Sequence, residues 1–381
     1  MIVKGNNYKD GKPIQVVIKD GKIDNILEAK SHEDDEIIIA PGFIDNQVNG
    51  YNGTNFMGNE LTVKKVKKTV ADFWQQGITT LFPTFITSEH SQLIENLKIF
   101  VEAQKNSLIN ASVPGFHLEG PYISPVDGYR GAHPIEHVRL PNWSEFQQYI
   151  EAANNKIIQI TLAPEVEGAI PFIKKCVEKG IVVALGHHNG TAEDIKKATD
   201  AGAILSTHLG NGCARNIDRA YNPLWAQLAE DRLKAQLICD GFHLEPEQVK
   251  TFYKTKGKDN IILTSDIVHI AGLPPGIYEF FGEKIEMTSE GMVVNPKTKT
   301  FAGAGLPLLV GIRNVMKFTN CSLAEAINMV TVNYTKLFPL SDRGELLEGK
   351  RADLVLFKIK DDKIEIHKTI VNGKVVYSKE N

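Results

Sequence analysis

The feature that most constrains this sequence is the alternation of short apolar segments with longer amphipathic ones. Eight apolar segments have the length of buried strands: 37–46, 79–85, 112–119, 157–163, 181–186, 203–207, 235–239 and 261–265. Amphipathic stretches of helical length lie between them, for example 61–76, 91–105, 169–179 and 192–200. Eight strand–helix units fit a closed (β/α)8 barrel of the TIM type. An open doubly wound sheet is the alternative, but no GxGxxG turn follows a strand, which disfavours a nucleotide-binding sheet.

Both ends of the chain have a pattern typical of small antiparallel strands. Near the N-terminus, turn-forming residues separate short apolar segments at 14–18, 23–27 and 37–39. Near the C-terminus the same pattern recurs at 353–357, 364–366 and 369–377, with Asn372-Gly373 as a tight turn. We therefore expect a small β-sandwich domain built from residues 1–40 and 347–381, with the barrel of residues 41–346 as a continuous insertion.

Polar residues gather at or just after the ends of the apolar strands. They are Asp45, Gln47, Asn49, His117, Glu119, His187, His188, His208, Asp240, His243 and Asp266. In a barrel, the carboxyl ends of all strands open on one face, where catalysis takes place. Histidines scattered through a core would not all follow strands, so this pattern predicts a functional site at that face.

The candidate metal ligands are Glu119, His187 and His208. Two imidazoles and one carboxylate suit Zn²⁺ or a similar divalent ion and leave a position for water. Taken singly, each could be a hydrogen-bonded structural residue; together, at strand ends, they indicate a metal site. His188 is offset by one residue from His187, and His117 lies two residues deeper than Glu119. We expect these two histidines to be structural or to support the ligands.

Asp266 is the candidate general acid and base, because it ends the eighth strand beside the predicted metal site. A metal lowers the pKa of water toward about 7, and a neighbouring carboxylate can take its proton and deliver it to a leaving group. The alternative is an aspartate that caps a helix or stabilises a turn.

Several motifs, taken in order, resemble those of the N-acetylglucosamine-6-phosphate deacetylases, a branch of the amidohydrolase superfamily. They are APGFID at 40–45, HLEGP at 117–121, GAH at 131–133, LAPE at 162–165, GH at 186–187, THL at 207–209, DGFH at 240–243, SD at 265–266, AGLPPG at 271–276 and GKRADL at 349–354. HLEGP and its ordered neighbours are specific, and the resemblance covers most of the chain. It implies a metal-dependent hydrolase barrel with a small β-domain made from both termini.

The resemblance also implies the metal site. Its metal ligands correspond to Glu119, His187 and His208, and its catalytic aspartate to Asp266. Most amidohydrolases carry HxH after the first strand, which gives a second metal position. In this sequence Gln47 and Asn49 stand there, and amides bind divalent cations poorly compared with imidazoles. We expect one ion, Zn²⁺ first, with Fe²⁺, Co²⁺ and Mn²⁺ as alternatives.

Substrate contacts also follow from the resemblance. His133 would contact the sugar or help to polarise the acetyl carbonyl, and Arg219 and His243 match positions that can reach the substrate of a neighbour across a dimer interface. Arg215 is a rival phosphate ligand, and a plain surface arginine is the alternative at either position. The remaining expected contacts, near the phosphate and over the sugar, are Asn211, Gly212, Ala302 and Gly303.

The resemblance predicts hydrolysis of N-acetylglucosamine 6-phosphate to glucosamine 6-phosphate and acetate. The sequence departs from the family pattern at 210–213, 267–270 and 302–307, and two of these segments lie near the expected sugar and phosphate pocket. Two alternatives therefore stay open. One is a deacetylase of a different N-acyl amino sugar, with or without phosphate, and the other is a catalytically silent barrel that acts as a binding protein.

Composition and charge argue against nucleic-acid-binding, secreted and membrane-spanning proteins. A formal net charge of -3 leaves no basic surplus to neutralise nucleic-acid phosphates. The four cysteines lack CxxC spacing, which indicates reduced thiols. The N-terminal residues lack the apolar stretch of a signal peptide, and no segment approaches the roughly 20 apolar residues that cross a bilayer. We expect a cytoplasmic homodimer that binds neither nucleic acid nor membrane.

Overall fold

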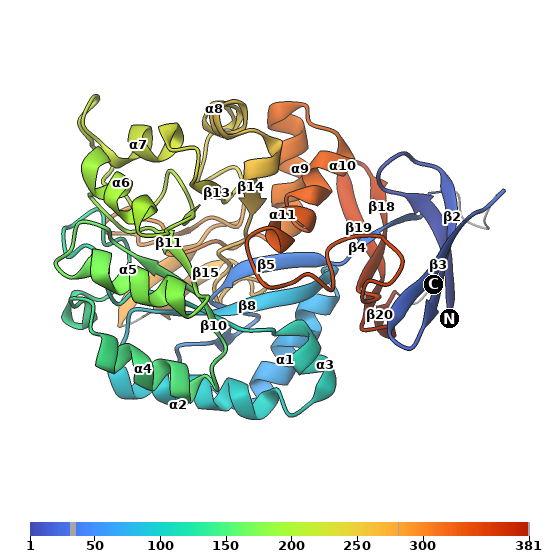
Figure 1. The fold of residues 1–381 in the computed structure, drawn as a ribbon, viewed down its shortest axis with the longest axis horizontal. Helices are drawn as coiled ribbons and strands as arrows, with labels where there is room; N and C mark the ends of the chain where they lie inside the picture. The colour runs from blue at the N-terminus through green and yellow to red at the C-terminus, as the bar shows by residue number, and fades with distance from the viewer. Residues whose placement is uncertain (31–35, 281, 380–381) are drawn as a thin grey trace.

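The barrel is an eight-stranded parallel sheet with its strands in chain order (Figure 1). The structure, a computed structural model, describes residues 1–30, 36–280 and 282–379. The barrel strands are β5 (Phe43–Val48), β8 (Ile78–Ile86), β9 (Phe116–Glu119), β10 (Ile157–Leu162), β11 (Val182–Leu185), β12 (Leu205–Ser206), β13 (Lys234–Leu237) and β14 (Ile261–Leu263). Each of the eight predicted segments overlaps a barrel strand, so the predicted TIM-type fold is confirmed.

Helices connect successive strands and surround the sheet. They are α1 (Val63–Trp74), α2 (His90–Ala103), α3 (Ser107–Ser112), α4 (Trp143–Ala152), α5 (Ala169–Glu178), α6 (Ala192–Asp200), α7 (Pro223–Ala229), α8 (Pro246–Lys256), α9 (Leu308–Thr319), α10 (Leu323–Asn328) and α11 (Val332–Thr335). In the described part of the chain, 3₁₀ helices span Ile135–His137 and Lys258–Asn260. Capping residues define the N-termini of several α-helices. At α6, for example, Thr191 and Asp194 form a capping box, which satisfies two otherwise unpaired backbone N–H groups.

Backbone contacts close most of the gap between β5 and β14, the two end strands of the sheet. The Ile44 N–H donates to Val330 O at 2.8 Å, and the Leu263 N–H donates to Met329 O at 3.0 Å. The 329–330 segment therefore bridges the two strands. Inside the barrel, buried apolar side chains from several strands pack with Tyr334 and Phe338, which follow the same segment. This apolar layer leaves the opposite, carboxyl-terminal face to the polar residues.

The prediction of one strand over 37–46 is wrong, because two strands of different sheets occupy it. β4 (Ile38–Pro41) belongs to the terminal sheet, whereas β5 enters the barrel. The break falls at Gly42, where an added Cβ would lie 2.2 Å from the side chain of Thr79. The predicted strand 112–119 is also too long. Ser112 ends α3, and β9 begins at Phe116.

Strands from both ends of the chain form one continuous seven-stranded sheet beside the barrel (Figure 1, right). Its order is β20-β19-β18-β4-β1-β2-β3. Besides β4, the strands are β1 (Ile2–Asn7), β2 (Pro13–Lys19), β3 (Lys22–Glu28), β18 (Leu354–Lys360), β19 (Lys363–Val371) and β20 (Lys374–Ser378). Asn372 and Gly373, both at positive φ, make the predicted tight turn between β19 and β20.

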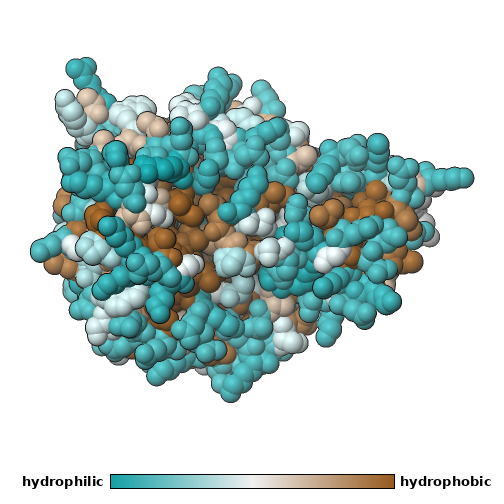
Figure 2. Space-filling view, in the orientation of Figure 1, coloured by the Kyte–Doolittle hydropathy of each residue, from teal (hydrophilic) through white to brown (hydrophobic). Residues whose placement is uncertain are grey.

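A three-stranded insertion follows β14 and was not predicted. It consists of β15 (Gly276–Phe280), β16 (Glu283–Met287) and β17 (Val293–Val294). A two-stranded hairpin, β6 (Gly50–Tyr51) and β7 (Thr54–Asn55), lies after β5. Polar side chains cover most of the face in Figure 2, and hydrophobic residues show between the helices and at the terminal sheet. Within the described ranges, every helix is too short or too polar to span a bilayer.

Candidate active site

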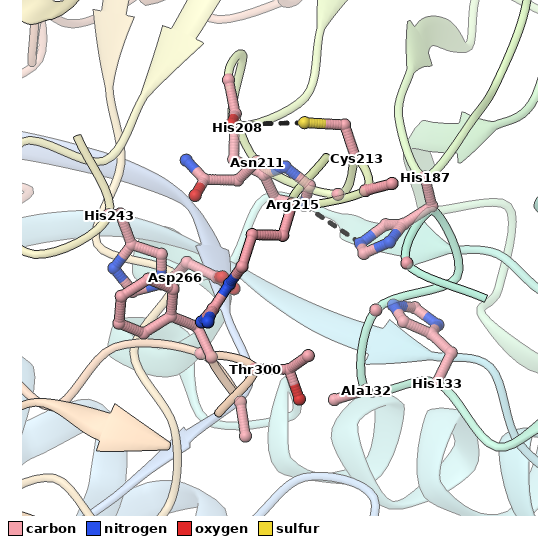
Figure 3. A pocket seen from close by; sticks show the side chains of 18 of the residues that line it. Ala132, His133, His187, His208, Asn211, Cys213, Arg215, His243, Asp266 and Thr300 are labelled. Carbon is pink, nitrogen blue, oxygen red and sulfur yellow. Dashed lines mark hydrogen bonds between the residues drawn. The ribbon is translucent and has the colours of Figure 1, made fainter. Parts of the chain in front are cut away.

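Three of the four predicted key residues lie just past a barrel strand in an unusual backbone conformation. His187 has φ 51°, His208 has φ 28° and Asp266 has φ 52°. Residues other than glycine rarely adopt this left-handed region, and such strained positions cluster at functional sites. The chain therefore bends directly after β11, β12 and β14, and all three side chains line the pocket at the mouth of the barrel (Figure 3).

The side chains of Glu119, His187 and His208 converge on one point. Glu119 Oε1 lies 2.9 Å from His208 Nε2 and 3.2 Å from His187 Nε2, and the two nitrogens are 3.1 Å apart. All three residues are buried. His187 Nδ1 lies 3.1 Å from Tyr129 O. Because a carbonyl only accepts, Nδ1 is the donor in this contact, and Nε2 faces Glu119 and His208.

This donor set fits a divalent cation. A carboxylate oxygen and two imidazole nitrogens lie within hydrogen-bond distance of one another, an arrangement that a proton or a cation between them stabilises. Burial alone would raise the pKa of Glu119, but its hydrogen bonds with His187 and His208 outweigh burial and hold that pKa well below its usual value. Glu119 is therefore anionic at neutral pH.

Asp266 lies in the same pocket, and the pKa of its carboxyl group is raised. Burial and the neighbouring charge of Glu119 raise the pKa of Asp266 to about 8, although a hydrogen bond from Asn49 opposes the shift. In that contact, Asn49 Nδ2 donates to Asp266 Oδ1 at 2.7 Å. A carboxyl group with a pKa near the working pH can act both as a base and as an acid.

We predict that metal binding releases a proton at neutral pH and tightens as the pH rises toward 8. In the protein alone the raised pKa keeps Asp266 protonated at pH 7, and a cation beside it favours the carboxylate. Below about pH 8 each unit of pH should therefore raise the apparent affinity up to about tenfold, and above it this contribution should level off.

Calorimetric titration of the metal-free protein with Zn²⁺, in buffers of different ionisation enthalpy, measures the number of protons released. Asp266→Asn is the control, since it cannot hold that proton. Equal proton release by the variant and the wild type would contradict the prediction.

Gln47 and Asn49 act as hydrogen-bond donors to the two acidic residues. Gln47 Nε2 donates to Glu119 Oε1 at 2.9 Å, while Gln47 Oε1 accepts from Gln236 Nε2 at 2.9 Å. The amide oxygen of Gln47 is thus already engaged, which favours one ion over two. Sequence reasoning missed Gln236, although its alternate position within strand β13 could have indicated an inward side chain.

The other histidines divide between the pocket and its surroundings. His133 Nδ1 lies 2.8 Å from Thr87 Oγ1, its ring lies 4.3 Å from that of His187, and its ligand atoms group with those of Glu119 and His187. Burial, followed by the neighbouring His187, lowers the pKa of His133 well below its usual value, so the ring is neutral.

Two other predicted histidines, His117 and His188, lie outside the pocket. His117 hydrogen bonds Thr161 at 2.8 Å inside the barrel, and His188 Nδ1 accepts from the Gly190 N–H at 3.2 Å. Neither lines the pocket.

A pocket of about 510 Å³ contains most of the predicted substrate contacts. These lining residues are His133, Asn211, Gly212, His243, Ala302 and Gly303. Arg219 does not line the pocket, whereas its rival Arg215 does, together with the unpredicted Lys299, Thr300 and Phe301. His243 Nδ1 lies 2.7 Å from Asp240 Oδ2, and its ring stacks on Phe301 at 4.4 Å. His243 lines the pocket of its own chain and is buried there; its contact with a neighbouring site stays a prediction.

Known proteins match this chain over nearly its whole length. Residues 38–376 match the Amidohydrolase family. N-acetylglucosamine-6-phosphate deacetylase of Bacillus subtilis is 32% identical over 95% of this chain and 92% of its own length. N-acetylgalactosamine-6-phosphate deacetylase of Escherichia coli O157:H7 is 30% identical over 90% and 89%. The crystal structure of N-acetylglucosamine-6-phosphate deacetylase from Thermotoga maritima, 31% identical, superposes with a TM-score of 0.86 and covers 100% of both chains.

Proposed function

Because the chain belongs to the amidohydrolase family, we propose that it hydrolyses the N-acetyl group of N-acetylglucosamine 6-phosphate to glucosamine 6-phosphate and acetate. One observation carries the chemistry: a carboxyl group that can exchange a proton near neutral pH, Asp266, shares a pocket with the set Glu119, His187 and His208. The substrate is supported by the full-length similarity to deacetylases of hexosamine phosphates.

The proposal includes one divalent ion, most simply Zn²⁺, with Fe²⁺, Co²⁺ and Mn²⁺ as alternatives. Glu119, His187 and His208 would hold it, since two imidazoles and one carboxylate are a common ligand set for catalytic zinc. When bound, the ion supplies a positive charge that polarises the acetyl carbonyl and makes water more acidic.

The side chains of the pocket would move the protons. Ionised Asp266 accepts a proton from the water that attacks the acetyl carbon, while Asn49 holds its Oδ1 and fixes the direction of the carboxylate. His133, which is neutral, lies beside His187 and hydrogen bonds the acetyl group. Protonated Asp266 then donates the same proton to the nitrogen as the carbon–nitrogen bond breaks. Asp266 would therefore both accept the proton from water and return it to the leaving amine.

We further propose a cytoplasmic homodimer. Arg219 is exposed outside the pocket of its own chain, and the indole of Trp225 donates to the Arg219 carbonyl at 2.9 Å. Tyr221 is 89% exposed and Trp225 is 55% exposed, so two large aromatic side chains flank this arginine at the surface. A second copy covering them would bury apolar area and could bring Arg219 toward the neighbour's substrate.

The sugar specificity is tested by acetate release from four compounds. We expect kcat/KM for N-acetylglucosamine 6-phosphate to exceed that for its 4-epimer by at least about tenfold, because one misdirected hydroxyl loses a hydrogen bond worth about 1 kcal/mol or more. The unphosphorylated forms of both sugars complete the panel.

Each result of the panel decides between functions. Faster turnover of N-acetylgalactosamine 6-phosphate would favour the second candidate function, which the relative from Escherichia coli O157:H7 supports. Faster turnover of unphosphorylated sugars would indicate a different amide substrate. No acetate from any compound by the zinc-loaded protein would indicate a binding protein.

A further inference from the structure

Amide side chains meet inside the barrel next to the proposed metal ligands. Asn46 of β5, Gln159 of β10 and Gln236 of β13 are completely buried there. The interior of such a barrel is ordinarily filled by branched apolar side chains. Because a buried polar group without a hydrogen-bond partner is costly, these amides must satisfy one another or their neighbours.

The direction of the hydrogen bonds follows from Glu119 at one end. A carboxylate only accepts, so Gln47 turns its amide nitrogen toward Glu119 Oε1, at 2.9 Å. The amide oxygen of Gln47 then faces Gln236. The Gln236 Nε2 donates to that oxygen at 2.9 Å and to Asn46 Oδ1 at 3.0 Å. Gln236 therefore uses both of its amide hydrogens and connects Gln47 to the interior amides.

The hydrogen bonds continue from Asn46 to His117. Asn46 Nδ2 donates to Gln159 Oε1 at 2.8 Å, and Gln159 Nε2 lies 3.1 Å from His117 Nε2. His117 Nδ1 lies 3.1 Å from the Asn46 carbonyl oxygen, which only accepts, so Nδ1 is the donor in that contact. Each amide is thus oriented by its neighbours. The four side chains that link His117 to Glu119 form the amide network: Asn46, Gln47, Gln159 and Gln236.

An irregularity in β5 lets two consecutive residues join the amide network. The register of β5 against β8 shifts between Asp45 and Val48. In a regular strand, successive side chains point to opposite faces, and a bulge removes this alternation. Asn46 and Gln47 can therefore both reach partners inside the barrel.

Gln236 has a buried polar atom that is left unpaired. Its Oε1 has no hydrogen-bond partner among the residues that the structure describes. An apolar side chain of similar length would fill the same space without this unfavourable term. The presence of an amide is consistent with a role for its nitrogen, the atom that contacts Gln47.

We propose that Gln236 is a positioning residue of the metal site and that it acts through Gln47. By fixing the Gln47 amide, it holds Glu119 Oε1 in place. That oxygen lies 2.9 Å from His208 Nε2 and 3.2 Å from His187 Nε2, so a rotation of the carboxylate would separate the three proposed ligands. The inference rests on the ligand set of the proposed function. It extends that set to a residue that contacts neither the ligands nor the pocket.

The test measures the affinity of the metal-free full chain for Zn²⁺ by competition with a chelator of known affinity. Methionine is unbranched like glutamine and forms no comparable hydrogen bond. We expect Gln47→Met to weaken zinc binding about 10- to 100-fold and Gln236→Met to weaken it about tenfold. In a chain that already carries Gln47→Met, Gln236→Met should change the affinity less than about threefold, because its effect passes through Gln47.

Gln104→Met is the matched control for the loss of a buried amide. Gln104 is buried outside the pocket, where it donates to the Val113 carbonyl at 2.8 Å and accepts from Lys156 at 3.1 Å. This variant should melt at a lower temperature than the wild type without a change in zinc affinity. Melting of each metal-free variant shows whether it is folded.

Gln236→Asn is a second variant that keeps an amide inside the barrel. Its side chain is one methylene shorter, so the nitrogen is withdrawn from Gln47, and zinc binding should again weaken about tenfold. Wild-type zinc affinity in a folded Gln236→Met or Gln236→Asn chain would overturn the proposal. Losses that simply add in the double variant would also overturn it, because Gln236 would then act independently of Gln47.

The positioning role and the proposed function fail in different ways. If N-acetylglucosamine 6-phosphate releases acetate while Gln236→Met keeps the wild-type zinc affinity, the function stands and the positioning role is wrong. If no sugar of the panel releases acetate but zinc affinity depends on Gln236 through Gln47, the positioning role stands and the proposed reaction is wrong.

Discussion

Asp266→Asn is expected to lower kcat for N-acetylglucosamine 6-phosphate by about 10²- to 10⁴-fold, the usual contribution of a general acid and base. Asparagine has nearly the same shape and can still meet Asn49, which holds Asp266 at 2.7 Å. It can neither take a proton from water nor return one to the leaving amine. The proposed ligands Glu119, His187 and His208 are unchanged, so the zinc content per chain should equal that of the wild type.

The measurement needs both turnover and metal content. Elemental analysis of the purified variant checks that zinc is retained, and steady-state acetate release gives kcat. Asp259→Asn is a suitable control, because Asp259 lies in the 3₁₀ helix before β14 and pairs with Lys336 far from the pocket. A zinc-loaded Asp266→Asn variant that keeps more than a tenth of wild-type turnover would exclude Asp266 from this role.

His208→Ala should abolish tight metal binding, with a loss of affinity of more than about 100-fold. His208 Nε2 lies within 3.1 Å of both Glu119 Oε1 and His187 Nε2, so its removal takes away one of three converging donors. Turnover should fall to the level of the metal-free protein. Added zinc should also no longer raise the melting temperature, because a metal stabilises the folded protein only to the extent that it binds the folded protein.

His188→Asn is the matched control for His208→Ala. His188 is also a buried histidine after a barrel strand, but it accepts a hydrogen bond from the Gly190 N–H and does not line the pocket. Burial lowers its pKa to about 4, so the substitution removes no charge at neutral pH. Retention of zinc by His208→Ala, or its loss from His188→Asn alone, would contradict the ligand assignment.

The barrel could be predicted because its elements follow from local patterns. Apolar segments of strand length and amphipathic segments of helix length are properties of neighbouring residues, and their alternation restricts the topology. The prediction failed where a long-range contact decides the structure. Gly42 divides 37–46 between two sheets, since Thr79 leaves no room for a side chain there. No local pattern contains that information.

The sequence indicated which residues converge in the pocket, but not how their individual atoms are oriented. Strand ends indicated Glu119, His187 and His208, but the orientation of Gln47 depends on Gln236, 189 residues away. That contact turns the amide nitrogen toward Glu119 and engages the amide oxygen elsewhere. The raised pKa of Asp266 likewise depends on burial and on the charge of Glu119, which only the folded barrel brings together.

By itself, therefore, the sequence determined the class of fold, the order of its strands and the kinds of side chain at their ends. Periodicity and side-chain chemistry depend only on residues that are neighbours in the sequence. Only the tertiary structure shows that Arg215 lines the pocket and that Arg219, four residues further along the same loop, does not. Loops have no periodicity from which the direction of a side chain could be inferred. Arg215 points into the pocket while contacting the carbonyl of Lys299, 84 residues further along the chain.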